Sequence, residues 1–238
     1  MQEETSTMSG NNEIKQGKRV FLKGRKLPEN NQVRICGIIE DEFEYDFENA
    51  TGIHCRSRIK VRRFSTVEDF VPIIVPVSLI KGALKTSLKG KKVEVTGTFC
   101  SYTEHGKNNQ RHLRMYLYPL TITIYDSDKE TEWQDNRNEV YLEGYISNKP
   151  LLRTTTLTKK MVAETVISVK RFPNKIDRIP LVFWGSEAVI ASEMEPGELI
   201  RIDGRIQSRE YFKSYSPGSE EGENKTFYEV SVKQIFEP

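Results

Sequence analysis

The 238-residue sequence is poor in cysteine and has no long apolar run. Its three cysteines, Cys36, Cys55 and Cys100, show no CxxC spacing, which argues against a disulfide framework and fits a reducing cytoplasm. The most apolar segment, 71–80, is interrupted by two prolines and is too short to span a bilayer. Residues 1–18 lack the apolar stretch of a signal peptide. We therefore expect a cytoplasmic protein with no membrane partner.

A strong charge of one sign is also missing, because 36 basic residues face 34 acidic ones and leave a net charge of +2. This balance excludes a histone-like or polybasic binder but is compatible with a local basic face. The sequence contains no GxxxxGK[ST], HExxH or GxSxG motif, and its histidines and cysteines lack paired metal-ligand spacing. We predict a protein that is not an enzyme, with no metal, no cofactor and no small-molecule substrate.

An internal repeat organises the chain, with a shift of about 107 residues between its two copies. The segment NQVRICGII from Asn31 matches NEVYLEGYI from Asn138, and KGKKVEVTGTFCS from Lys89 matches PGELIRIDGRIQS from Pro196. Further matches occur between them in the same order. Two copies of one domain therefore follow each other along the chain.

Each copy is predicted to be mostly strand, with the two-residue alternation of half-buried strands. Five strands with one helical segment between the third and fourth is the order of an OB fold. Gly97 and Gly204 fall within the fourth strands, where coiled barrel strands often need a bend or bulge. We predict an all-β protein of two tandem OB-fold five-stranded barrels. Its predicted divisions are a mobile segment 1–18, a first OB fold 19–125, a linker 126–137 and a second OB fold 138–238.

A basic row marks the second strand of the first copy. Alternation places Arg58, Lys60 and Arg62 on one face of this strand and Ile59 and Val61 on the other. Three like charges on one face favour an anionic ligand such as a nucleic-acid backbone. The alternative interpretation is a solvated edge strand whose cations only prevent aggregation.

Aromatic residues are candidates for stacking on bases, although strand aromatics are more often part of a core. Tyr211 and Phe212 are adjacent and point in opposite directions, so only one of them can be buried. Tyr211 shares the exposed parity of Arg209, which favours stacking. Trp184 either stacks on a base or packs under the helix, and Tyr116 either binds or belongs to the core.

The second copy resembles the bacterial single-stranded DNA-binding protein (SSB) family. The resemblance rests on GYISNKPLLR from Gly144, on the Trp-Gly junction at 184–185, and on GRIQSREY from Gly204. The first copy resembles a diverged version, as in family members with two OB folds per chain. The resemblance implies wrapping of single-stranded DNA during replication, recombination or repair at the bacterial nucleoid, with stacking at Trp184 and Tyr211. Arg178 stands where some members carry tryptophan.

The predicted interface combines cations and aromatic residues of these strands with those of the loops that join the last two strands of each copy. The nucleic-acid-binding residues that we predict are Arg58, Lys60, Arg62, Tyr102, Lys107, Arg111, Tyr116, Arg153, Lys170, Arg171, Phe172, Arg178, Trp184, Arg205, Arg209 and Tyr211.

Two functions are compatible with these residues. The first is sequence-tolerant binding of single-stranded DNA by a chain that pairs with a second copy into a pseudo-tetramer of OB folds. The alternative is a protein-docking or primosome-assembly protein, similar to PriB, with weak DNA binding. The uneven aromatic residues favour the alternative, and the basic strand favours the first.

Overall fold

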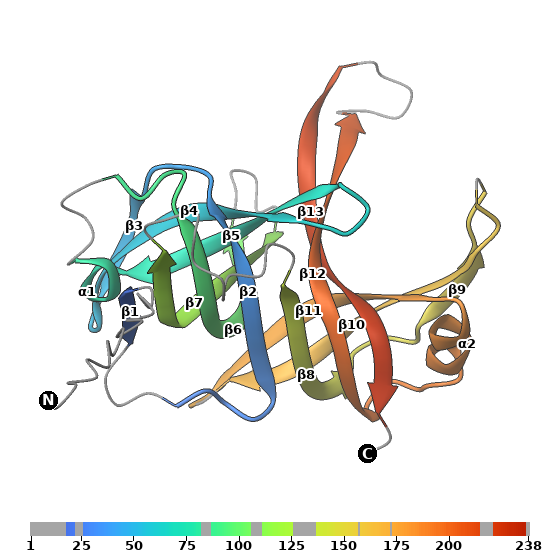
Figure 1. Ribbon diagram of the computed structural model, residues 1–238. Coiled ribbons are helices and arrows are strands. Elements are labelled where there is room, and N and C mark those ends of the chain that lie inside the picture. The colour runs from blue at the N-terminus through green and yellow to red at the C-terminus, as the bar shows by residue number, and fades with distance from the viewer. Residues whose placement is uncertain are drawn as a thin grey trace, which may run out of the picture.

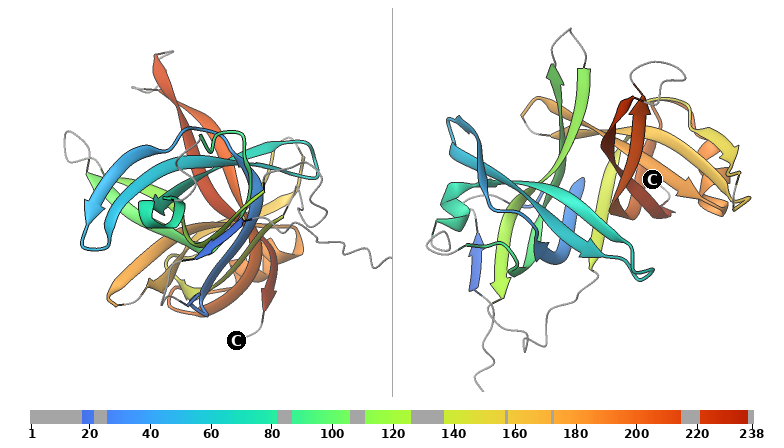
Figure 2. Two further views of the ribbon diagram at one scale, coloured as in Figure 1. Left: turned by 60° about the vertical axis from the view of Figure 1, so that its left-hand side comes forward. Right: turned by 90° about the horizontal axis from the view of Figure 1, so that it is seen from above.

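The computed structural model describes residues 18–21, 26–81, 87–105, 111–125, 137–156, 158–171, 173–214 and 221–236. Nearly all of the predicted N-terminal segment and linker lies outside these residues. The described part folds as two β-barrels that lie side by side (Figures 1 and 2). No helix among the described residues has the length and apolar character needed to cross a membrane.

The two barrels repeat the same order of elements. The first consists of β1 (Lys18–Phe21), β2 (Asn31–Ile39), β3 (Glu44–Asn49), β4 (Gly52–Arg62), β5 (Glu68–Pro76), α1 (Val77–Ile80), β6 (Lys92–His105) and β7 (Arg111–Tyr125). The second consists of β8 (Asn138–Ile146), β9 (Leu151–Thr154), β10 (Met161–Arg171), β11 (Lys175–Trp184), α2 (Ser186–Ser192), β12 (Leu199–Ser214) and β13 (Gly222–Phe236). The tandem OB folds and the helix after the third main strand are confirmed. The short strands β1, β3 and β9 were not predicted.

Strand alternation builds the core of each barrel. On β2 and β4, Val33, Ile35, Ile59 and Val61 are at most 1% exposed, because every second side chain points inward. Each barrel closes through one parallel contact, β5 with β7 and β11 with β13. Antiparallel ladders form the rest of each wall.

The mid-strand glycines mark a bulge in each barrel, as the sequence predicts. The register shifts at Thr96/Gly97 in the β6–β7 ladder and at Asp203/Gly204 in the β12–β13 ladder. A Cβ atom at Gly97 would lie 2.2 Å from the carbonyl oxygen of Tyr118, so only glycine allows this close approach of two strands. The identical bulges also align the two barrels residue by residue.

The barrels join through their edges into one sheet. β2 pairs antiparallel with β8, so that Val33 lies opposite Val140. The hairpin between β4 and β5 also reaches across to β12 of the second barrel (Figure 1). The β2–β8 register is symmetric about Val33 and Val140, which are equivalent positions of the repeat, so the two barrels are related by an approximate twofold axis.

Two equivalent buried clusters hold the barrels together. In one, Asp69 accepts hydrogen bonds from Arg63 at 2.6 and 2.7 Å and from the backbone N–H of Ser208 at 2.7 Å. In the other, Asp177 accepts a bond from the backbone N–H of Ser101 at 2.6 Å and pairs with Arg171 at 3.2 Å. Both aspartates are 0% exposed. A carboxylate of one barrel thus satisfies a backbone donor of the other.

Candidate nucleic-acid interface

The basic row of β4 has the predicted orientation, but two of its three cations already have acidic partners. Arg58 donates to Asp41 at 2.6 and 3.1 Å, and the Lys60 ammonium lies 3.6 Å from Glu40. Arg62 is exposed and makes no ion pair with the described residues. Among the described residues, carboxylates pair with Arg58 and Lys60 but not with Arg62.

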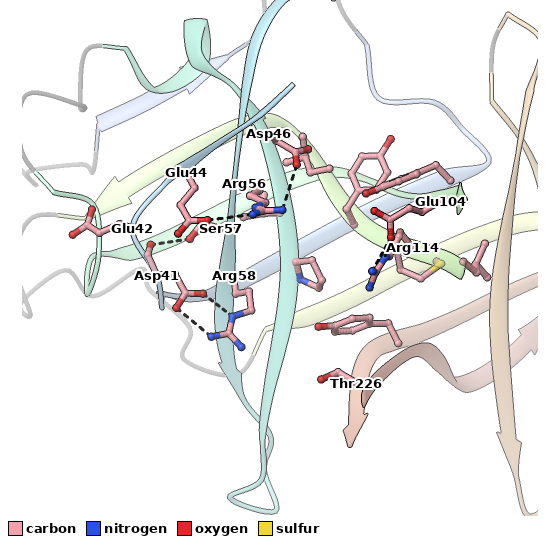
Figure 3. A pocket seen from close by; sticks show the side chains of 18 residues that line it. Asp41, Glu42, Glu44, Asp46, Arg56, Ser57, Arg58, Glu104, Arg114 and Thr226 are labelled. Carbon is pink, nitrogen blue, oxygen red and sulfur yellow. Dashed lines mark hydrogen bonds and ion pairs between the residues drawn. The ribbon is translucent and has the colours of Figure 1, made fainter. Parts of the chain in front are cut away.

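A pocket of about 460 Å³ opens beside this row, between the outer face of the first barrel and the base of the β12–β13 hairpin. All of its charged side chains except that of Glu42 are paired with one another, as Figure 3 shows. Arg56 lies 3.3 Å from Glu44, and Arg114 donates to Glu104 at 2.7 Å. The first barrel therefore presents a face on which most cations are already neutralised by neighbouring carboxylates.

Strand β3 causes much of this neutralisation. It pairs with β4 as β9 pairs with β10, and it carries Glu44 and Asp46, both ion-paired to Arg56. At the equivalent place β9 carries Arg153, which donates to Glu164 at 2.8 Å. The same strand is thus acidic in one barrel and basic in the other.

The outer face of β10 and β11 is open and cationic. The ladder places Lys170, Arg178 and Trp184 on this side, because their parity is opposite to that of the buried Ile179 and Phe183. Lys170 and Arg178 are exposed, and neither makes a side-chain ion pair with the described residues. Trp184 is 40% exposed, so its ring does not pack wholly under α2.

Aromatic and basic side chains continue along the long hairpins. Tyr211 is 44% exposed on β12, and its neighbour Phe212 is 54% exposed on the opposite face. The guanidinium of Arg209 lies 5.6 Å from the centre of the Phe227 ring and 3.8 Å from Glu229. On the first hairpin, Tyr102 is 43% exposed. These side chains extend each outer face beyond its barrel.

Arg171 and Tyr116, both predicted to contact DNA, instead bind each other across the junction of the barrels. The Arg171 guanidinium donates to the Tyr116 hydroxyl at 3.0 Å and to the carbonyl of Ser101 at 3.3 Å. Burial raises the pKa of Tyr116 to about 12, so its hydroxyl stays protonated. Sequence reasoning could not foresee this role, because the partners lie 55 residues apart in different barrels. We leave both residues out of the interface proposed below.

The remaining predicted residues are placed unevenly. Arg111 is exposed at the start of β7, and Arg205 lies half-buried between the barrels. Lys107 and Phe172 lie outside the described residues. Within the described residues, no three His, Cys, Asp or Glu side chains gather as metal ligands would.

Sequence reasoning missed the acidic partners and part of the junction. Asp41 and Glu40 follow β2, and no local pattern links them to Arg58 and Lys60. Phe64 is 90% exposed on the β4–β5 hairpin. Its position beside three basic residues was the one signal that could have marked it.

The outer faces thus expose cations and aromatic rings, and comparison with known proteins shows what the second barrel is similar to. The model of the single-strand binding protein family matches residues 137–236. The match spans the whole described length of the second barrel, from β8 to β13.

Curated relatives support this similarity. The chain is 41% identical over 80 residues to the single-stranded DNA-binding protein of Clostridium tetani, covering 31% of this chain and 55% of the relative. It is 38% identical over 80 residues to single-stranded DNA-binding protein 3 of Clostridium acetobutylicum, covering 31% and 56%. The chain spans about half the length of the curated relatives that it matches.

A solved structure extends the similarity beyond the second barrel. The wild-type single-stranded DNA binding protein from Thermus aquaticus matches with a TM-score of 0.65 and 15% sequence identity. The match covers 87% of this chain and 92% of that chain. The first barrel therefore shares the fold of that protein, although the family model matches only the second barrel.

Proposed function

We propose that this protein binds single-stranded DNA with little sequence preference, mainly on the outer face of its second barrel. One observation carries the proposal. This face exposes Lys170, Arg178 and Trp184 together, and neither cation is balanced by a carboxylate of the described residues. Cations for phosphates and ring faces for bases are what sequence-tolerant binding requires.

The ion pairs on the outer face of the first barrel suggest that this barrel contributes less to DNA binding than the second. A phosphate that binds there must displace a carboxylate, such as Asp41 from Arg58. We propose that the first barrel binds DNA more weakly than the second. A role in replication, recombination or repair, and assembly of two chains into a pseudo-tetramer at the nucleoid, remain our predictions.

Titration with oligothymidine tests the proposed function. We expect the fluorescence of Trp184 to be quenched, with an affinity that falls with salt at a slope of about 0.7 per neutralised phosphate. A PriB-like docking protein would show weak binding and little quenching. No change at micromolar protein would refute DNA binding as the function.

The substitution Asp41→Asn is expected to strengthen binding. The hydrogen bond from Arg58 lowers the pKa of Asp41, so the pair is intact at neutral pH and breaks only as acid protonates the carboxylate. Asparagine removes the competing charge at every pH and frees Arg58 for a phosphate. Because an exposed pair contributes about 0–1 kcal/mol, affinity for oligothymidine should rise by up to about fivefold.

The matched control is Glu143→Gln, which breaks the Arg201–Glu143 pair of the same 2.6 Å length on β8 and β12. Both variants raise the net charge by one, but only Asp41→Asn should steepen the salt dependence. Equal effects would show that net charge, and not Arg58, causes the change.

A further inference from the structure

A second pocket lies between the barrels, and it is strongly cationic. Its volume is about 320 Å³, and the β4–β5 hairpin of the first barrel faces β12 and β13 of the second across it. The residues that line it are Val61, Arg62, Arg63, Phe64, Asp69, Asn138, Arg205, Ser231 and Lys233. Four cations therefore face one carboxylate.

This carboxylate, Asp69, already accepts hydrogen bonds on both of its oxygens. Asp69 binds Arg63 through both oxygens and the Ser208 backbone through one of them. Arg62, Arg205 and Lys233 are left without an ion pair among the described residues. Arg205 is half-buried, and burial together with the nearby Arg63 charge lowers its pKa. Like charges held this way repel each other until an anion enters.

The twofold relation between the barrels supplies an internal comparison. The shared bulges align Arg205 with Thr98. They also align Lys233 with Leu120, which are the extra, unpaired residues of the two bulges. The buried Arg–Asp pair is present on both sides, as Arg63–Asp69 and Arg171–Asp177. Holding the barrels together therefore does not require Arg205 and Lys233. The two positive charges of Arg205 and Lys233 therefore occur on one side of the junction only, since the equivalent residues on the other side, Thr98 and Leu120, are uncharged.

We propose that this pocket binds one phosphodiester of the single-stranded DNA, with the adjacent base against the ring of Phe64. The inference rests on the proposed function and names a subsite of it. Arg62 ends the basic row of β4 and lines the pocket, so a strand on the first barrel would be led into the junction. Phe64 is 90% exposed, which leaves its ring free to stack.

The test is the double variant Arg205→Gln/Lys233→Gln, titrated with oligothymidine at several salt concentrations. We expect about tenfold weaker binding in 0.1 M salt and a salt slope smaller by about 0.7, the value for one phosphate on a single strand. The control Arg201→Gln/Lys149→Gln removes one arginine and one lysine that already pair with Glu143 and Glu195, so it should leave the slope unchanged.

The outcomes separate the two proposals. If the unmodified protein does not bind oligothymidine, the proposed function fails; if it binds and the double variant has the same slope, only the pocket fails. Thermal stabilisation by dTMP that the double variant abolishes, with unchanged oligothymidine binding, would assign the pocket to a free monophosphate and overturn the proposal.

A second variant guards against misfolding. Phe64→Ala alters a side chain that is 90% exposed, and it should weaken binding at least about fivefold without changing the slope, because stacking releases no counterions. Unchanged affinity would show that no base stacks on Phe64.

The folding of the double variant Arg205→Gln/Lys233→Gln is checked by its melting temperature. This temperature should equal or exceed that of the unmodified protein, since the repulsion at Arg205 is relieved.

Discussion

Replacing Asp69 with alanine is expected to lower the free energy of unfolding by about 3–5 kcal/mol, the cost of removing one partner of a buried ion pair. The Asp69 carboxylate is 0% exposed and holds both the Arg63 guanidinium and the Ser208 backbone N–H. Alanine leaves a guanidinium and a backbone donor without partners at the junction. The measurement is urea unfolding, where the midpoint should fall while the slope stays constant.

The matched control is Asp41→Ala, which breaks an Arg–Asp pair of equal length at the surface. The Asp41 and Arg58 side chains are 39% and 48% exposed, so water replaces the lost contact and the expected loss is at most about 1 kcal/mol. Two separate unfolding transitions in Asp69→Ala would show that the cluster couples the barrels. A loss as small as the control's would mean that the junction does not depend on this carboxylate.

Removing the rings of Trp184 and Tyr211 together is expected to have the largest effect on DNA affinity. Each stacked base contributes about 1–3 kcal/mol, so the double alanine variant should lose about 2–6 kcal/mol if both rings stack. The salt slope should stay the same, because no cation is removed. Anisotropy of labelled oligothymidine measures both quantities and does not depend on the lost tryptophan.

Phe212 provides the comparison for Tyr211. It is the next residue, is similarly exposed at 54%, and points to the other side of the hairpin. Phe212→Ala should leave the affinity unchanged, whereas Tyr211→Ala alone should weaken it. Equal losses would indicate that the hairpin's conformation matters more than stacking, and no loss in either would place the DNA elsewhere.

Local patterns predicted the fold because its determinants are local. The alternation around Ile59 and Val61 defines a half-buried strand, and the bulges at Gly97 and Gly204 require glycine. Because the sequence repeats, the strand alternation and the mid-strand glycine each occur in both copies, which made the prediction of each barrel firmer. Strand β3 was not predicted, although Tyr45 and Phe47 alternate with acidic residues in its sequence EYDFEN. Both aromatic side chains are exposed, so this strand adds nothing to the buried core that marks the other strands.

The charge state of the candidate site could not be predicted in the same way. The alternation of Arg58, Lys60 and Arg62 gives the face on which they lie, but not the distant carboxylates that meet them. Arg171 likewise belongs to a strand with the right parity, and its role depends on a hydroxyl from the other barrel. Pairings between segments far apart are set by the closed fold, which one sequence does not display.

The edge pairing of β2 with β8 inside a single chain has a consequence for the ligand. In a dimer of identical subunits, the twofold axis would place the same side chains at both ends of a DNA strand that crosses the junction. Such a dimer would therefore bind the strand equally well in either direction. Here Thr98 and Leu120 stand at one end of the twofold relation, and Arg205 and Lys233 at the other. A polynucleotide crossing the junction would therefore meet different side chains at its 5′ and 3′ ends, so the tandem chain would bind it in one preferred direction.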